Sequence, residues 1–98
     1  MDEKLHRELW TSWASLLRSY AAAHGLNSPQ HAVVEVSEEC ITVRHGLRWI
    51  SFTSAAYESS EGSTFPFFLT ENGTAVVDGL EDEMDLAAER LAREIIAA

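Results

Sequence analysis

The sequence predicts a single α+β domain over residues 1–98, in which two helices pack on one face of an antiparallel sheet as a two-layer sandwich. Apolar residues recur at helical spacing in residues 2–24 and 80–96, and they alternate at strand spacing in several short runs between. We therefore expect a long N-terminal helix, a meander of four to five strands and a C-terminal helix. A chain of 98 residues has room for one hydrophobic core, so its size predicts a single domain.

The first helix is predicted over residues 2–24, with Gly25 as the cap because glycine readily adopts the left-handed conformation. Its apolar stripe consists of Leu5, Leu9, Trp13, Leu16 and Tyr20. Trp10 and Leu17 widen this stripe beyond what one sheet face usually covers. The extra width is either buried within the domain or shared with a second copy. The triplet Asn27-Ser28-Pro29 then predicts a break.

Three short alternating runs follow, at residues 31–37, 40–45 and 47–53. The connections Glu38-Glu39 and His45-Gly46 are short enough for tight hairpins, so the runs predict a three-stranded meander. Loops of two residues pair Val36 with Ile41, Val34 with Val43, and Ile41 with Ile50. The predicted core face then comprises Ala32, Val34, Val36, Ile41, Val43, Ile50 and Phe52.

The opposite face of this meander is the candidate interaction surface, comprising Val33, Glu35, Thr42, Arg44, Leu47 and Trp49. The predicted cross-strand rows are Glu35 with Thr42 and Trp49, and Val33 with Arg44 and Leu47. Tryptophan and arginine are enriched where protein interfaces are strongest, so this face is typical of a docking surface. Alternatively, the polar segment 54–64, predicted to be a mobile surface loop, covers the face with Tyr57 lying across Trp49.

A second hairpin is predicted from residues 65–70 and 74–78. The pair Asn72-Gly73 is suited to positive backbone angles at both central positions of a tight turn. Pro66 lacks an amide hydrogen, which places the start of the first strand at a sheet edge or before regular pairing begins. The order of these two strands within the sheet stays open.

The last helix is predicted over residues 80–96, with an apolar stripe of Leu80, Met84, Ala88, Leu91 and Ile95. The acidic run 81–85 forms its solvated first turns, where carboxylates favour the positive end of the helix dipole. Leu86 falls on the polar side of this helix. Together with the wide stripe of the first helix, Leu86 is compatible with an isologous homodimer.

Charge restricts the class of partner, because 16 acidic residues against seven basic ones give a net charge of −9. Nucleic acids and anionic membrane surfaces are repelled by such a chain, whereas a basic or hydrophobic protein partner is favoured. The N-terminus carries charges of both signs, and no apolar run is long enough to span a membrane. With Cys40 as the lone cysteine, these features predict a cytoplasmic protein.

The sequence contains no recognisable catalytic, metal-binding or cofactor-binding motif. Cys40 has acidic neighbours in Glu38 and Glu39, which disfavour the thiolate that a nucleophile requires. The four histidines lack the spacing of metal ligands, and the acidic run 81–85 lacks the alternating ligands and central glycine of a calcium loop. We expect no enzymatic activity, no cofactor and no metal.

The sequence therefore predicts a small acidic, non-catalytic protein-interaction module, such as an adaptor, a chaperone-like protein or a neutralising partner. Binding is expected through the candidate surface or through the acidic helix. The alternative is a small-molecule-binding domain with an aromatic pocket between helices and sheet. That pocket would be lined by Trp10, Trp13, Phe52, Tyr57 and Phe67.

Overall fold

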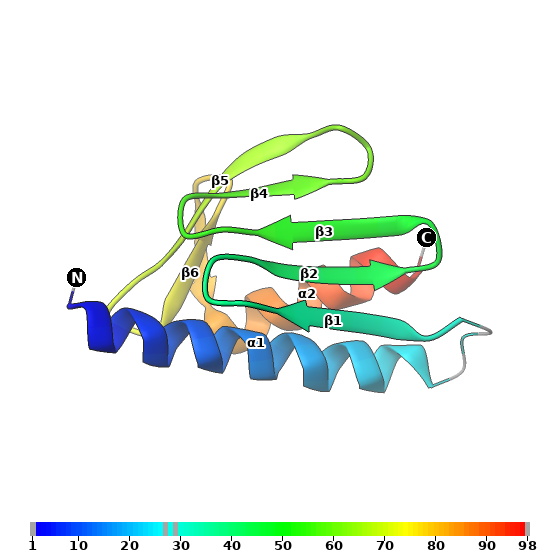
Figure 1. Ribbon diagram of the computed structural model, residues 1–98, viewed down its shortest axis with the longest axis horizontal. Coiled ribbons are helices and arrows are strands. Elements are labelled where there is room, and N and C mark those ends of the chain that lie inside the picture. The colour runs from blue at the N-terminus through cyan, green and yellow to red at the C-terminus, as the bar shows by residue number, and fades with distance from the viewer. Residues whose placement is uncertain (1, 27, 29, 98) are drawn as a thin grey trace.

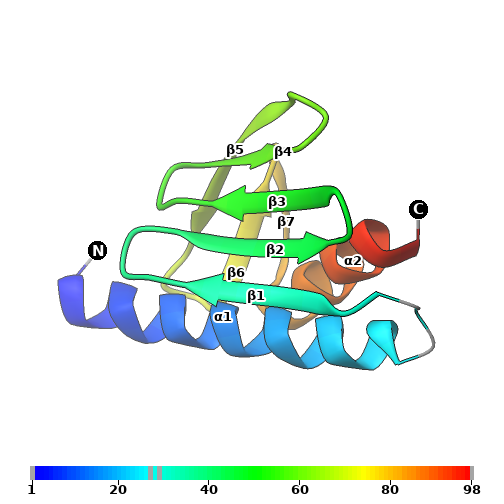
Figure 2. The ribbon, with the colours of Figure 1, turned by 45° about the vertical axis from the view of Figure 1, so that its right-hand side comes forward.

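A computed structural model describes residues 2–26, 28 and 30–97 of the chain. Two helices, α1 (Glu3–Gly25) and α2 (Met84–Ala97), pack on an antiparallel sheet of seven strands. The strands are β1 (Ala32–Val36), β2 (Ile41–His45), β3 (Arg48–Phe52), β4 (Ala56–Ser59), β5 (Thr64–Leu69), β6 (Thr74–Val77) and β7 (Leu80–Glu83). In Figures 1 and 2, α1 runs alongside β1 and α2 lies behind the sheet. The predicted α+β architecture is confirmed, but four to five strands was too few.

The strands neighbour one another in chain order, so the sheet is a continuous meander from β1 to β7. Its inner face and the two helices enclose one hydrophobic core. Trp13, Leu17 and Phe52 are fully buried in that core, together with Phe67 from β5. Neither described helix is long and apolar enough to cross a membrane.

Helix α1 begins where Asp2 caps it, because the Asp2 Oδ1 atom accepts a hydrogen bond from the Lys4 amide at 3.1 Å. The helix continues through Gly25 and ends at Leu26, which has right-handed backbone angles. The prediction of a left-handed cap at Gly25 is therefore wrong. Asn27 and Pro29, which belong to the predicted break, lie outside the described residues.

The wide apolar stripe of α1 is explained by two packing partners, since the helix contacts both α2 and the sheet. Trp10, Trp13 and Leu17 are all buried, with 6%, 0% and 0% of their surface exposed. The extra width is thus used within the domain. This outcome removes one of the two observations that suggested a homodimer.

The register of the first hairpin is as predicted, with Val36 opposite Ile41 and Val34 opposite Val43. In the second hairpin Ile41 lies opposite Phe52, and the predicted pairing with Ile50 is wrong. The turn residues are Gly46 and Leu47, not His45 and Gly46, because Gly46 supplies the positive φ of 65° at the first turn position. A register shift of two residues leaves the side chains within β2 and β3 on their predicted faces and moves Leu47 into the turn.

Most of the predicted core face of the meander is buried. Ile41, Val43, Ile50 and Phe52 are buried, while Ala32 and Val34 are half-buried. Val36 is the exception, with 40% of its surface exposed. It ends the edge strand β1, where only one neighbouring strand can shield it.

The segment predicted to be a mobile loop, residues 54–64, instead contains β4 and extends the sheet. Thr53 organises the entry to β4, because its Oγ1 accepts hydrogen bonds from the amides of Ala55 and Ala56. Tyr57 lies opposite Phe52, on the core side of the sheet, with 5.5 Å between the ring centroids. The alternative in which Tyr57 covers Trp49 is therefore wrong.

Strand β5 changes partners along its length, pairing with β4 over residues 64–66 and with β6 over residues 67–69. Pro66 lies at this change of partner, inside the strand rather than at its start. The predicted hairpin at Asn72-Gly73 exists, with a loop of three residues closed by a 2.9 Å hydrogen bond from the Thr70 amide to the Thr74 carbonyl. Within this described loop only Gly73 has a positive φ, of 78°, so the expectation of a positive angle at Asn72 as well is wrong.

Leu80–Glu83 forms strand β7, so the prediction that the last helix begins at Leu80 is wrong. The preceding pair Asp78-Gly79 makes the tight turn, with φ of 50° and 82°, as a type I′ hairpin requires. Leu80 consequently leaves the helical stripe and is 55% exposed. The rest of that stripe is buried as predicted, namely Met84, Ala88, Leu91 and Ile95.

Candidate protein-interaction surface

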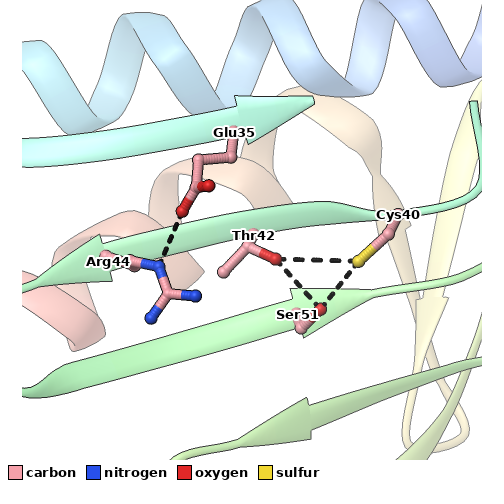
Figure 3. A network of polar contacts seen from close by, with 5 residues as sticks. All are labelled: Glu35, Cys40, Thr42, Arg44 and Ser51. Atoms are coloured by element: carbon pink, nitrogen blue, oxygen red, sulfur yellow. Dashed lines mark hydrogen bonds and ion pairs between the residues drawn. The ribbon is translucent and has the colours of Figure 1, made fainter. Parts of the chain in front are cut away.

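The side of β1, β2 and β3 that faces away from the helices is the candidate surface, called here the open face. Alternation along the strands places on it Val33, Glu35, Cys40, Thr42, Arg44, Trp49 and Ser51. Figure 3 shows five of these side chains on neighbouring strands. Five of the six residues predicted for the surface are therefore brought together.

The observed cross-strand rows differ from the predicted ones because of the shifted second hairpin. One row is Val33, Arg44 and Trp49, and the next is Glu35, Thr42 and Ser51. Leu47 is not on the face at all, since it occupies the β2–β3 turn with 98% of its surface exposed. Val33 is 50% exposed and Trp49 is partly exposed, so the first row presents the apolar part of the surface.

Arg44 and Glu35 neutralise each other on this face, with 2.6 Å between Arg44 Nε and Glu35 Oε1. Their side chains are 53% and 59% exposed, so water screens the pair. Such pairs stabilise a fold by about 0.2–1 kcal/mol at most. The pair therefore contributes more to the pattern of charge on the surface than to stability.

Cys40, Thr42 and Ser51 form a triangle of polar contacts beside this ion pair (Figure 3). The Cys40 Sγ atom lies 3.0 Å from Ser51 Oγ and 3.6 Å from Thr42 Oγ1, and the two hydroxyl oxygens are 3.1 Å apart. These groups satisfy one another across β2 and β3. Sequence reasoning missed the triangle, because the contact of Thr42 with Ser51 depends on the register of the second hairpin.

The open-face side of the sheet continues onto β5, β6 and β7 by the observed registers. Phe68 lies opposite Val76, and Val76 lies opposite Glu81. Phe68 is 48% exposed, which adds a second apolar group to this side of the sheet. Sequence reasoning missed this row because β7 was read as helix, although Asp78-Gly79 is a recognised hairpin signal.

The β6–β7 hairpin and the start of α2 form the most acidic part of the chain. Residues 71–85 include no lysine or arginine and carry six acids, Glu71, Asp78, Glu81, Asp82, Glu83 and Asp85. Glu81 accepts a hydrogen bond from Thr74 Oγ1 at 2.7 Å, and Asp82 pairs with Arg90. Glu81 and Glu83 project on the same side of the sheet as Phe68.

The aromatic residues predicted to line a ligand pocket contribute instead to the packed core. The rings of Trp13, Phe52 and Phe67 are fully buried, and their centroids are 5.0–5.5 Å apart. Trp10 is also buried and donates a hydrogen bond from Nε1 to the Ser37 carbonyl at 3.0 Å. Of the five, Tyr57 lies beside a hollow next to α2, which is described below.

The described residues contain no group of three or more histidine, cysteine, aspartate or glutamate side chains arranged to hold a metal ion. No protein-family model matches the chain, and no curated protein or solved structure shows significant similarity to it.

Proposed function

We propose that this protein is a small acidic, non-catalytic interaction module that holds a protein partner on its open face. The observation that carries the proposal is the position of segment 54–64. This segment was the candidate cover for the face, but it extends the sheet and directs Tyr57 to the core side. Val33 and Trp49 thus stay accessible at the centre of a polar surface.

The chemistry of the surface favours a basic partner with exposed apolar side chains. Glu35 and Arg44 are matched to each other, so the centre of the face is close to neutral. The whole chain carries a net charge of −9. Basic residues in a partner would be attracted to this negatively charged chain, while nucleic acid would be repelled.

The proposal is tested with a short synthetic peptide of lysine and leucine and a counterpart in which glutamate replaces lysine. Amide chemical shifts are followed by NMR during titration at two salt concentrations. The lysine peptide is expected to perturb amides of β1, β2 and β3, and to bind more weakly at high salt. Perturbations confined to the helices, or equal binding of the glutamate peptide, would contradict the proposal.

Variants sharpen this test. Trp49→Ala should weaken binding of the lysine peptide by about tenfold, as loss of a central anchor does, while the domain stays folded. Leu86→Ser is the matched control, because Leu86 is 58% exposed on α2 and lies away from the open face. Unfolding of Trp49→Ala would show that Trp49 is a core residue and would remove it from the surface.

Self-association is the competing use of the same face, since a second copy is also a protein partner. Light scattering of the wild type and of Trp49→Ala distinguishes the two. A dimer that becomes a monomer in the variant would assign the face to a second copy. The net charge of −9 opposes that pairing at low salt, so we expect a monomer.

A further inference from the structure

A hollow of about 170 Å³ lies on the core side of the sheet, between the β4–β5 hairpin and the C-terminal half of α2. Figure 1 shows this hairpin beyond β3, at the edge of the β1–β4 layer that is far from α1. Only the second half of β5 is paired with β6, so the first half is flanked by β4 alone. The inner side of the hairpin is thus incompletely covered by the rest of the chain.

Aromatic rings form one wall of this hollow. The Tyr57 and Phe65 rings stack with their centroids 5.0 Å apart and their planes 26° from parallel. Both side chains are partly exposed, and Leu91 and Ile95 of α2 supply an apolar surface on the other side. A cavity of about 150 Å³ accommodates a benzene ring, so this hollow has room for one six-membered ring and a small polar group.

The polar groups around the hollow favour positive charge. Glu61 and Glu94 contribute carboxylates, and the C-terminal end of α2 presents carbonyl oxygens with partial negative charge. Arg48 lies at this end of the helix, and its Nη1 donates to the carbonyls of Glu94 at 3.2 Å and Ile95 at 3.1 Å. The chain's own guanidinium therefore already occupies one cation position here.

Two polar groups near the hollow are not fully paired within the chain. Among the described residues, the Ser59 Oγ atom is buried at this hollow without a hydrogen-bond partner. Arg48 Nη2 is 3.8 Å from Glu61 Oε1, which is at the limit of an ion pair. Burial raises the pKa of Tyr57, the charges of Glu94 and Asp78 raise it further, and Arg90 lowers it.

We infer that this hollow is a binding site for a small primary amine whose ammonium group is carried on an aromatic or branched aliphatic body. The body would lie against Tyr57 and Phe65, and the ammonium would meet the Glu94 carboxylate. The hollow is lined mainly by residues on the core side of the sheet, and Trp49 is a lining residue that it shares with the open face.

The inference is tested by NMR titration with benzylammonium, with benzyl alcohol as the neutral probe of the same shape and benzoate as the anion. We expect benzylammonium to shift signals of Tyr57, Ser59 and Phe65 saturably. Benzyl alcohol should bind more weakly by about threefold or more, because it lacks the positive charge that Glu94 attracts. Equal binding of the alcohol, tighter binding of benzoate, or no saturable shift would overturn the inference.

Two substitutions complete the experiment. Glu94→Gln should weaken benzylammonium binding by about threefold or more, because it removes one charge while keeping the side-chain shape. Glu58→Gln is the matched control, since Glu58 is exposed on the same strand as Tyr57 and Ser59 but points to the opposite side of the sheet. Equal effects of the two substitutions would show only non-specific charge attraction and would overturn the assignment.

Discussion

Arg90 of α2 and Asp82 of β7 form an ion pair, with 2.7 Å between Nη1 and Oδ2. Their side chains are 27% and 29% exposed, so the pair is more shielded from water than the pair of Arg44 and Glu35. The contact ties β7 to the helix that follows it. It also uses a carboxylate that the sequence suggested would be solvated in the first turn of that helix.

A double-mutant cycle on Asp82→Asn and Arg90→Gln should give a coupling energy of about 1 kcal/mol, because partial burial strengthens the attraction. The same cycle on Glu35→Gln and Arg44→Gln is the comparison, and about 0.3 kcal/mol is expected for that exposed pair. Urea unfolding measures both. A larger coupling energy for the exposed pair would contradict the role assigned to Asp82.

Gly79→Ala and Gly25→Ala should change stability in opposite directions. Gly79 has a φ of 82°, where a Cβ atom costs about 1–2 kcal/mol, so its substitution is expected to destabilise the fold. Gly25 is in α1 and an added Cβ would lie 4.0 Å from the Ala32 Cβ, which is ordinary contact. There alanine should stabilise by about 0.5–1 kcal/mol, as measured by urea unfolding. Destabilisation at Gly25 would instead indicate a strained helix end.

Leu17→Ala should destabilise the domain by about 2–5 kcal/mol, because the Leu17 side chain of α1 is fully buried in the core. Leu47→Ala is the matched control and should change stability by less than about 0.5 kcal/mol, since Leu47 is 98% exposed in a turn. Thermal or urea unfolding distinguishes the two. A large loss of stability in Leu47→Ala would show that the Leu47 side chain packs against the domain.

Stability should fall at alkaline pH through Tyr20. Its hydroxyl donates to Asp85 at 2.6 Å, and this hydrogen bond, followed by burial and by the charges of Asp85 and Glu89, raises the pKa of Tyr20 above 10.0. The folded state then keeps a proton that the unfolded state loses, so the contribution is complete below pH 10.0 and is lost as pH rises through the folded pKa.

The measurement is the free energy of unfolding on both sides of pH 10.0, the ordinary tyrosine value. Tyr20→Phe should flatten the fall, and tyrosinate absorbance should show that Tyr57, the other tyrosine, also titrates late. An unchanged pH dependence in Tyr20→Phe would show that other groups cause the fall.

Most of the secondary structure could be predicted from local spacing. The apolar stripe of α1 and the alternation through β1, β2 and β3 each lie within one continuous segment, so period alone indicates their type and their buried face. The candidate surface followed from the same alternation, which is why Val33, Glu35, Thr42, Arg44 and Trp49 share one face. Leu47 was the exception, because a hairpin turn can move by one residue along the chain without changing the pattern.

The parts that were missed depend on pairing between segments. Residues 80–83 read as the start of a helix because acidic residues suit a helix N-terminus, yet Asp78-Gly79 turns the chain so that they pair with β6. Residues 54–64 read as a loop because they are polar, yet β3 and β5 supply hydrogen-bond partners on both sides of β4.

The sequence by itself determined the helix and strand periods, the single core and the acidic charge. Tertiary structure alone decided the number of strands, the pairing of Ile41 with Phe52 and the hollow beside Tyr57. The physical reason is that a strand is stabilised by backbone hydrogen bonds to a neighbouring strand. The local pattern of residues does not specify which segment that neighbour is.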